Sequence, residues 1–129
     1  MRKPYFIGTW GAWEKSPEQL IPGTFRLYLT EMVKIEDKKI IKGTIEDCFG
    51  EATFEGEMCS SHIKFTKRYS KEAIEKGGHW DKIEYRGAEV NGLYAGKFII
   101  VNGILDNIGT VGNWEGTFYM SQYFGPSLN

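Results

Sequence analysis

A five-residue pattern, in which one glycine lies two residues from a large apolar residue on either side, recurs along the whole chain. Its copies are Phe6-Ile7-Gly8-Thr9-Trp10, Ile41-Lys42-Gly43-Thr44-Ile45, Phe54-Glu55-Gly56-Glu57-Met58, Tyr94-Ala95-Gly96-Lys97-Phe98 and Trp114-Glu115-Gly116-Thr117-Phe118. Side chains alternate between the two faces of a β-strand, so each glycine shares a face with its large neighbours. Glycine inside a strand marks a bend or a close approach of the backbone. The pattern is therefore typical of a sheet curled into a small barrel.

The length and composition are those of one folded domain. The chain has 129 residues, of which 41% are hydrophobic and 15% aromatic, enough for a packed core in a single β-barrel domain over residues 1–129. Sixteen basic and 17 acidic residues are interspersed along the sequence, and the net charge is -1. Because no basic stripe exists, nucleic acid and anionic membranes are not expected partners.

The cysteines and histidines predict neither a disulfide nor a metal site. Cys48 and Cys59 bracket a predicted strand and would lie ~35 Å apart along it, well beyond the reach of a disulfide. Two free thiols, and an N-terminus without an apolar signal region, predict a cytoplasmic location. His62 and His79 lack metal-ligand spacing, so we expect no metal and no cofactor.

Short alternating segments separated by turn signals predict an all-β fold, an eight-stranded antiparallel up-and-down β-barrel. The strands are expected at residues 5–13, 24–35, 40–47, 52–59, 62–69, 82–91, 93–101 and 112–121. One short helix is predicted at residues 71–76, between the fifth and sixth strands. Ser70 is its expected N-cap, and Gly77 and Gly78 its end.

The connections between these strands differ in length at the two ends of the barrel. Tight turns at residues 36–39, 60–61 and 91–92 all fall at one end, which we expect to be closed. The connections 14–23, 48–51, 70–81 and 102–111 fall at the other end, and three of them are long. Long loops on a rigid scaffold commonly carry function, so a ligand site is expected at a loop-rimmed mouth.

The face that carries the glycines is the predicted interior. Its large residues are Phe6, Trp10, Phe25, Leu27, Leu29, Ile41, Ile45, Phe54, Met58, Ile63, Phe65, Tyr69, Ile83, Tyr85, Tyr94, Phe98, Trp114, Phe118 and Met120. Core packing is the simplest role for any one of them. An eight-stranded barrel is wide enough either to be filled by side chains or to hold one small ligand near its mouth.

Four charged residues interrupt this inward apolar pattern: Glu31, Asp47, Lys67 and Glu89. Lys67 lies between two inward aromatic positions near the mouth, where an isolated buried ammonium would be costly. Asp47, at the same end, is its available partner. Three roles stay open for Lys67: a solvated or structurally paired cation, an anchor for a ligand carboxylate or phosphate, and a Schiff-base or proton-transfer group.

Aromatic residues near the mouth are the other candidates. Tyr69 and Tyr85 can present hydroxyl groups to a pocket, and Trp13 and His79 lie in or beside the mouth loops. His79 is also the mouth residue suited to proton transfer near neutral pH. The predicted ligand-binding residues are Trp10, Trp13, Asp47, Lys67, Tyr69, His79, Tyr85 and Trp114.

Gly8-Thr9-Trp10, on the first predicted strand of a chain of this length, resembles the opening of the calycin superfamily. Lipocalins carry Gly-x-Trp there, and avidins carry Gly-Thr-Trp. The resemblance implies an eight-stranded meander with ligand-gating loops at one end. The strand continues Gly11-Ala12-Trp13, where avidins have a polar biotin-binding stretch, so biotin is not expected and no functional residue is carried over.

Three function classes follow. The first is a binding protein that holds a small, partly apolar and potentially anionic molecule in the mouth of the barrel. The second is an isomerase, cyclase or hydratase in which Lys67, Asp47 or His79 transfers protons. The third is a packed barrel that acts through its outer surface. Fold alone does not separate these classes.

One part of the outer surface is apolar enough to predict a homodimer. Ile99 and Val101 point outward on the seventh strand, and Tyr119 and Ile7 lie on the strands beside it. A soluble monomer rarely exposes such a cluster. We expect a second copy of the chain to cover it, with residues 122–129 as the alternative cover.

Overall fold

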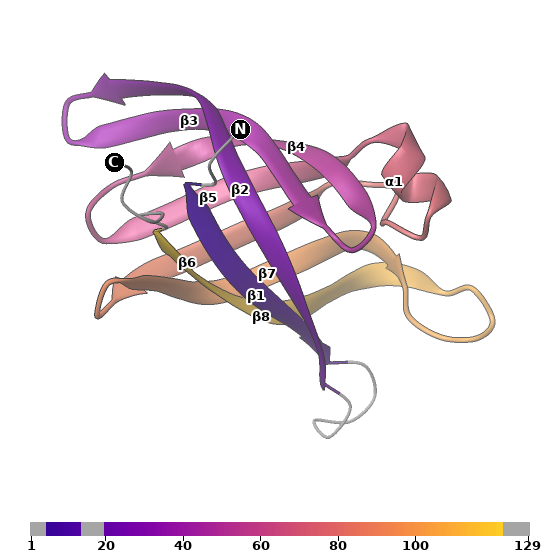
Figure 1. Cartoon of the computed structure of the whole chain (residues 1–129). Coiled ribbons are helices and arrows are strands. Elements are labelled where there is room, and N and C mark those ends of the chain that lie inside the picture. Colours follow the sequence, from indigo (N-terminus) through magenta and orange to yellow (C-terminus); the bar gives the residue numbers. More distant parts are fainter. Residues whose placement is uncertain (1–4, 14–19, 123–129) are drawn as a thin grey trace.

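The chain folds into a closed antiparallel β-barrel in which each strand pairs with the next and β8 pairs with β1 (Figure 1). The structure is a computed structural model that describes residues 5–13 and 20–122, without the side chains of residues 11–13 and 20–22. Its elements are β1 (Phe6–Trp13), β2 (Leu20–Ile35), β3 (Lys38–Asp47), β4 (Gly50–Met58), β5 (His62–Tyr69), α1 (Lys71–Glu75), β6 (Ile83–Val90), β7 (Leu93–Ile104) and β8 (Val111–Gln122). The predicted fold class is confirmed.

The strand ends differ from the sequence prediction mainly at the loop end. β2 begins at Leu20 rather than at residue 24, and β7 continues to Ile104. The loop predicted at 102–111 therefore shortens to residues 105–110, and the pairing of β7 with β8 carries an irregularity between Ile100 and Gly103. Sequence pattern does not predict these extensions because ladder hydrogen bonds continue beyond the alternating apolar segment.

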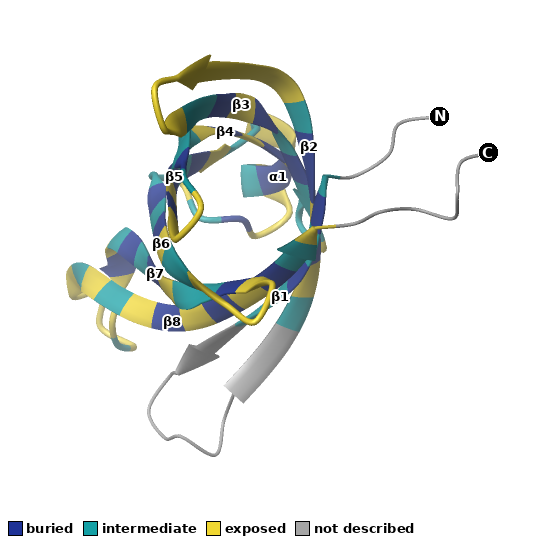
Figure 2. Ribbon diagram, turned by 90° about the vertical axis from the view of Figure 1, so that its left-hand side faces the viewer, coloured by how far each residue is buried: buried dark blue, intermediate teal, exposed yellow. Residues whose placement is uncertain are grey.

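Alternation along the strands separates a buried interior from an exposed exterior, as Figure 2 shows along the barrel. Every residue predicted on the inward face is buried or half-buried. Glycines let the walls approach closely. At Gly8, for example, a Cβ atom would lie 2.5 Å from the Phe25 ring and 2.6 Å from Met120 Cβ.

Aromatic rings fill the middle of the barrel around Tyr85. The Phe65 ring stacks on Tyr85 with centroids 4.5 Å apart and an interplanar angle of 8°. Phe118, Phe98 and Phe25 surround the same ring at 5.2, 5.6 and 6.5 Å. Contacts of this kind add to the stabilisation that burial of the rings provides. Any ligand site inside the barrel must therefore lie toward one end.

The prediction that Glu31 interrupts the inward face is wrong, whereas Glu89 shares a face with Tyr94, its inward partner on β7, but is exposed. A β-bulge between Leu29 and Glu31 shifts the pairing of β2 with β3, and Glu31 is exposed beyond it. Glu89 is exposed at the other end of the barrel wall, where its carboxylate accepts a hydrogen bond from the Gly92 backbone N–H at 2.7 Å. Bulges re-aim side chains, and a pattern of period two does not predict them.

Helix α1 lies at the loop end of the barrel, away from the tight turns (Figure 1). Ser70 is its N-cap, as predicted, and its hydroxyl accepts a hydrogen bond from the Ala73 N–H at 3.1 Å. The helix ends before Gly77, whose φ of +108° suits a residue without a Cβ atom. No helix in the described part of the chain is long and apolar enough to cross a bilayer.

Candidate functional site

A polar cluster lies inside the barrel near the loop end. Lys67 is 1% exposed, and its Nζ lies 2.7 Å from Asp47 Oδ2, 2.9 Å from the Tyr69 hydroxyl and 3.5 Å from the Tyr85 hydroxyl. The Tyr69 hydroxyl also donates to Asp47 Oδ2 at 2.5 Å, while the other carboxylate oxygen accepts from the Phe49 N–H at 2.9 Å. All three ammonium donors thus face protein acceptors.

Strand register brings this cluster together. On β5, Ile63, Phe65 and Lys67 alternate inward, so the ammonium enters the interior along with the core side chains. Asp47 ends β3, two strands away, and the flexible four-carbon stem of Lys67 spans the distance. Phe49, in the turn after β3, packs edge-on against Tyr69, with centroids 5.9 Å apart.

The surroundings of the cluster favour one protonation state for each of its groups. Burial by itself would lower the pKa of the Lys67 ammonium, but Tyr85, Tyr69 and Asp47 raise that pKa above its ordinary value. Burial raises the pKa of Tyr69 and also that of Tyr85. Lys67 is therefore an ammonium beside two neutral phenols at neutral pH. A Schiff base needs the free amine, so this environment favours the charged roles predicted for Lys67.

An aromatic cluster continues from the polar cluster toward β1, β7 and β8. Tyr85 contacts Phe98, and the Phe98 ring lies between two indoles, 6.0 Å from Trp10 and 6.2 Å from Trp114. Both tryptophans are half-buried and pack on the barrel core. The two clusters together give the loop end of the interior a polar side and an aromatic side.

Trp10 carries an unsatisfied hydrogen-bond donor. Among the side-chain nitrogen and oxygen atoms that the structure describes, its Nε1 is the one that is buried without a partner. The indole lies against Gly23 on the neighbouring strand, where a Cβ atom would come within 2.7 Å of Nε1. Because most buried donors in proteins have a partner, an unsatisfied one calls for a specific explanation.

The remaining predicted site residues lie outside these two clusters. The side chain of Trp13 is outside the described residues. His79 Nε2 lies 2.6 Å from the carbonyl oxygen of Val101, to which it donates, so the imidazole ties the segment after α1 to β7. In the described part of the chain, no group of three or more His, Cys, Asp or Glu residues could hold a metal ion.

No protein-family model matches this chain, and no curated protein matches it either. Its architecture, an eight-stranded up-and-down barrel, is consistent with a calycin-like ligand-binding scaffold. Evidence for a function of this chain therefore comes from its own side chains.

Sequence reasoning missed two features of this molecule. The alternation predicts Phe98 in the core, but not as the ring that lies beside both tryptophans. The sequence prediction weighs Cys59 for a disulfide and His62 for a metal site but does not relate the two, although the tight turn predicted at Ser60 and Ser61 makes them neighbours across a hairpin. A two-residue turn was the available signal, because it pairs the residues on either side of it.

Proposed function

We propose that this protein binds a small, largely apolar molecule at the loop end of its barrel. The observation that carries the proposal is the buried, unpartnered N–H of Trp10 beside the Phe98 ring. Ligand sites are typically apolar surfaces with a few well-placed polar groups. A ligand oxygen or nitrogen that accepts this hydrogen bond would satisfy the donor, while Phe98 and Trp114 contact its apolar part.

The polar cluster supports the same proposal from the opposite side of the interior. Its ammonium and the Asp47 carboxylate neutralise each other, so the cluster gives that side of the interior polar groups without a net charge. Because the three donors of Lys67 already face Asp47, Tyr69 and Tyr85, Trp10 is the better candidate for the direct hydrogen bond. A ligand-anchoring role for Lys67 stays a prediction.

Indole N–H resonances provide the test, because the chain has only four tryptophans. Protein with ¹⁵N-labelled indoles would be titrated with pairs of small aromatic compounds that differ only in one carbonyl group. We expect the carbonyl compound to shift the Trp10 resonance in a saturable way and its hydrocarbon partner to bind less tightly. One hydrogen bond corresponds to about a tenfold difference in affinity.

Two variants control this experiment. Trp10→Phe removes the donor, so it should assign the resonance and weaken the carbonyl compound more than the hydrocarbon. Trp80→Phe alters an indole that is 59% exposed and should leave both affinities unchanged. A screen in which no compound moves the Trp10 resonance, together with native mass spectra of an empty barrel purified from its own cells, would refute the proposal.

A further inference from the structure

A second set of reactive side chains lies at the opposite end of the barrel, in the turn between β4 and β5. Cys59 Sγ lies 3.5 Å from Ser61 Oγ, and Ser61 Oγ lies 2.8 Å from His62 Nδ1. The turn holds this arrangement, because the Cys59 N–H donates to the His62 carbonyl at 2.9 Å. A thiol, a hydroxyl and an imidazole thus form one hydrogen-bonded chain.

The hydrogen-bonded side chains of Cys59, Ser61 and His62 can move a proton away from the Cys59 sulfur. The thiol proton passes to Ser61 Oγ as the Ser61 proton passes to His62 Nδ1, which leaves a thiolate, a hydroxyl that donates to it, and an imidazolium. Hydrogen bonds from the Ser61 side chain and backbone, and from His62, lower the pKa of the Cys59 thiol to about 7. Thiolates are the reactive form of cysteine, and they occur in partly exposed, electropositive surroundings.

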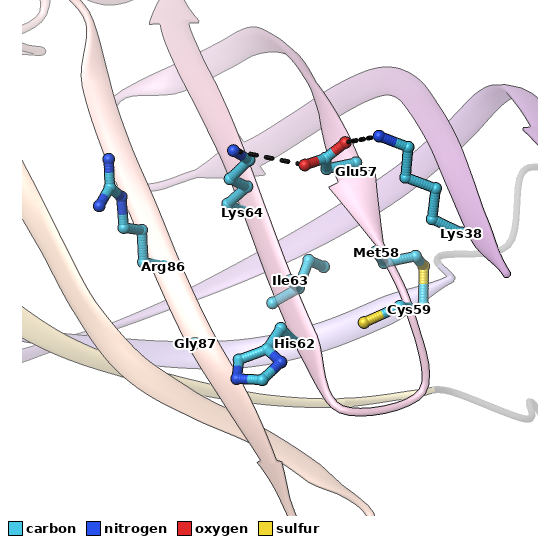
Figure 3. Close-up of a pocket in the computed structure, with 9 residues that line it drawn as sticks. All are labelled: Lys38, Glu57, Met58, Cys59, His62, Ile63, Lys64, Arg86 and Gly87. Atoms are coloured by element: carbon cyan, nitrogen blue, oxygen red, sulfur yellow. Dashed lines mark ion pairs between the residues drawn. The ribbon is translucent and has the colours of Figure 1, made fainter.

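Most of the charged side chains around Cys59 are basic. Cys59 and His62 line an open pocket of about 390 Å³ whose charged rim, among the described residues, holds Lys38, Lys64, Arg86 and one carboxylate, Glu57 (Figure 3). A second carboxylate, Glu89, lies nearby on β6, where its backbone N–H donates to the Ser61 carbonyl at 2.8 Å. Glu57 pairs with both lysines, at 3.1 and 3.3 Å.

Arg86 is the cation of this rim that is best placed to meet an anion. It lies directly opposite Lys64 on β5 and opposite Lys97 on β7. Like charges in directly opposed positions repel one another, so an anion bound beside Arg86 would relieve that repulsion.

Cys48, the other cysteine, lies in contrasting surroundings. It is exposed and lines a different open pocket of about 640 Å³, where, among the described residues, Glu46, Asp47 and Glu51 accompany Arg26. The chain therefore contains its own control: one thiol with a proton acceptor and a basic rim, and one thiol in acidic surroundings.

We propose that Cys59 is a site of thiol–disulfide exchange with small disulfides that carry carboxylates, the class that includes glutathione disulfide. The Cys59 thiolate attacks one sulfur of the disulfide, so a new bond forms between that sulfur and Sγ as the original S–S bond breaks. The released half leaves as a thiolate and takes the proton held on His62. Electrons balance within the exchange, and no further oxidant is needed.

The expected rate advantage of Cys59 over an ordinary cysteine can be estimated. A thiol of pKa about 7 is about half ionised at pH 7, against about 3% for an ordinary cysteine. Its lower basicity reduces the nucleophilicity of each thiolate about fivefold, which leaves a net advantage of about threefold. Attraction to the basic rim increases this advantage for anionic reagents only. For these reagents we expect Cys59 to react more than tenfold faster than an ordinary cysteine.

The test compares the two thiols in the full-length chain as the single-cysteine variants Cys48→Ser and Cys59→Ser. Each would react at pH 7 with dithionitrobenzoate, which is dianionic, and with cystamine, which is dicationic. Cys59 should react more than tenfold faster than Cys48 with the anionic disulfide, and that ratio should fall to about threefold or less with cystamine. Peptide mass mapping after exposure of wild-type protein to glutathione disulfide should find the mixed disulfide on Cys59.

Three further variants separate the contribution of the Ser61–His62 proton relay to the reactivity of Cys59 from that of the charged rim. His62→Gln and Ser61→Ala should each move the midpoint of the pH–rate profile of Cys59 to higher pH. Arg86→Gln should slow the reaction with dithionitrobenzoate without slowing that with cystamine. Equal or faster reaction of Cys48 with the anionic disulfide, or a pH midpoint that neither relay variant changes, would overturn the proposal.

Discussion

Lys67 and Asp47 form an ion pair inside the barrel, with Nζ 2.7 Å from Oδ2 and side chains that are 2% and 0% exposed. Removal of one partner from such a pair leaves an uncompensated buried charge, whereas replacement of both by apolar residues is often nearly neutral. The pair therefore affects stability in a way that single and double variants distinguish.

Lys67→Met should destabilise the protein by about 3–5 kcal/mol, because the Asp47 carboxylate would stay buried without its cation. Urea denaturation measures the loss. The double variant Lys67→Met, Asp47→Leu is the control and should recover most of it. If the single variant loses less than about 1 kcal/mol, water must reach Asp47 and the cluster is not sealed.

Alkaline pH should weaken the fold through the same cluster. The pKa values of Lys67, Tyr69 and Tyr85 are all raised in the folded state, so the unfolded chain releases these protons first. Their contribution to stability is therefore complete below about pH 10, the ordinary range of both side chains, and is lost as the pH rises above it.

Urea denaturation between pH 8 and 11 checks this slope, with Tyr85→Phe as the matched variant. Without one of the three titrating groups, the free energy of unfolding should fall less steeply above about pH 10. Equal slopes for the two proteins would contradict the role assigned to Tyr85.

Gly56→Ala should cost about 1–3 kcal/mol through overpacking. A Cβ atom at Gly56 would lie 2.5 Å from Phe65 Cα and 2.6 Å from Phe65 Cβ, so the backbone of β5 would have to move. Thermal unfolding of Gly56→Ala and of its neighbour Glu55→Ala makes the comparison. Glu55 is exposed, and its variant should stay within about 0.5 kcal/mol of wild type.

The homodimer predicted from the sequence can be tested on the outer face of β7, β8 and β1. Ile7, Ile99 and Val101 are half-buried there, and Tyr119 is 56% exposed. Light scattering at tens of micromolar should give a dimer for wild type and a monomer for Ile99→Lys. Glu55→Lys, on β4 across the barrel, should leave the dimer intact. A monomeric wild type would rule out this interface.

Most of the inward face was predictable, because the strand period of two and the recurrent glycines assign a side to each residue without reference to its partners. Phe65, Lys67 and Tyr69 are assigned to the interior by this alternation alone. The capped helix after β5 was equally accessible, since Ser70 and Gly77 act within a few residues of chain.

Tertiary pairing decided the rest. The bulge before Glu31 depends on how β2 meets β3, and the three partners of Lys67 come from β3, β5 and β6. Closure of β8 onto β1 places Trp10 beside Phe98, where its N–H has no acceptor among the described residues. Most of these relationships join residues far apart in the chain, and they arise from strand register and barrel closure. Local pattern predicts that the sheet closes and which side chains share a face, but it does not fix the register that makes two of them neighbours.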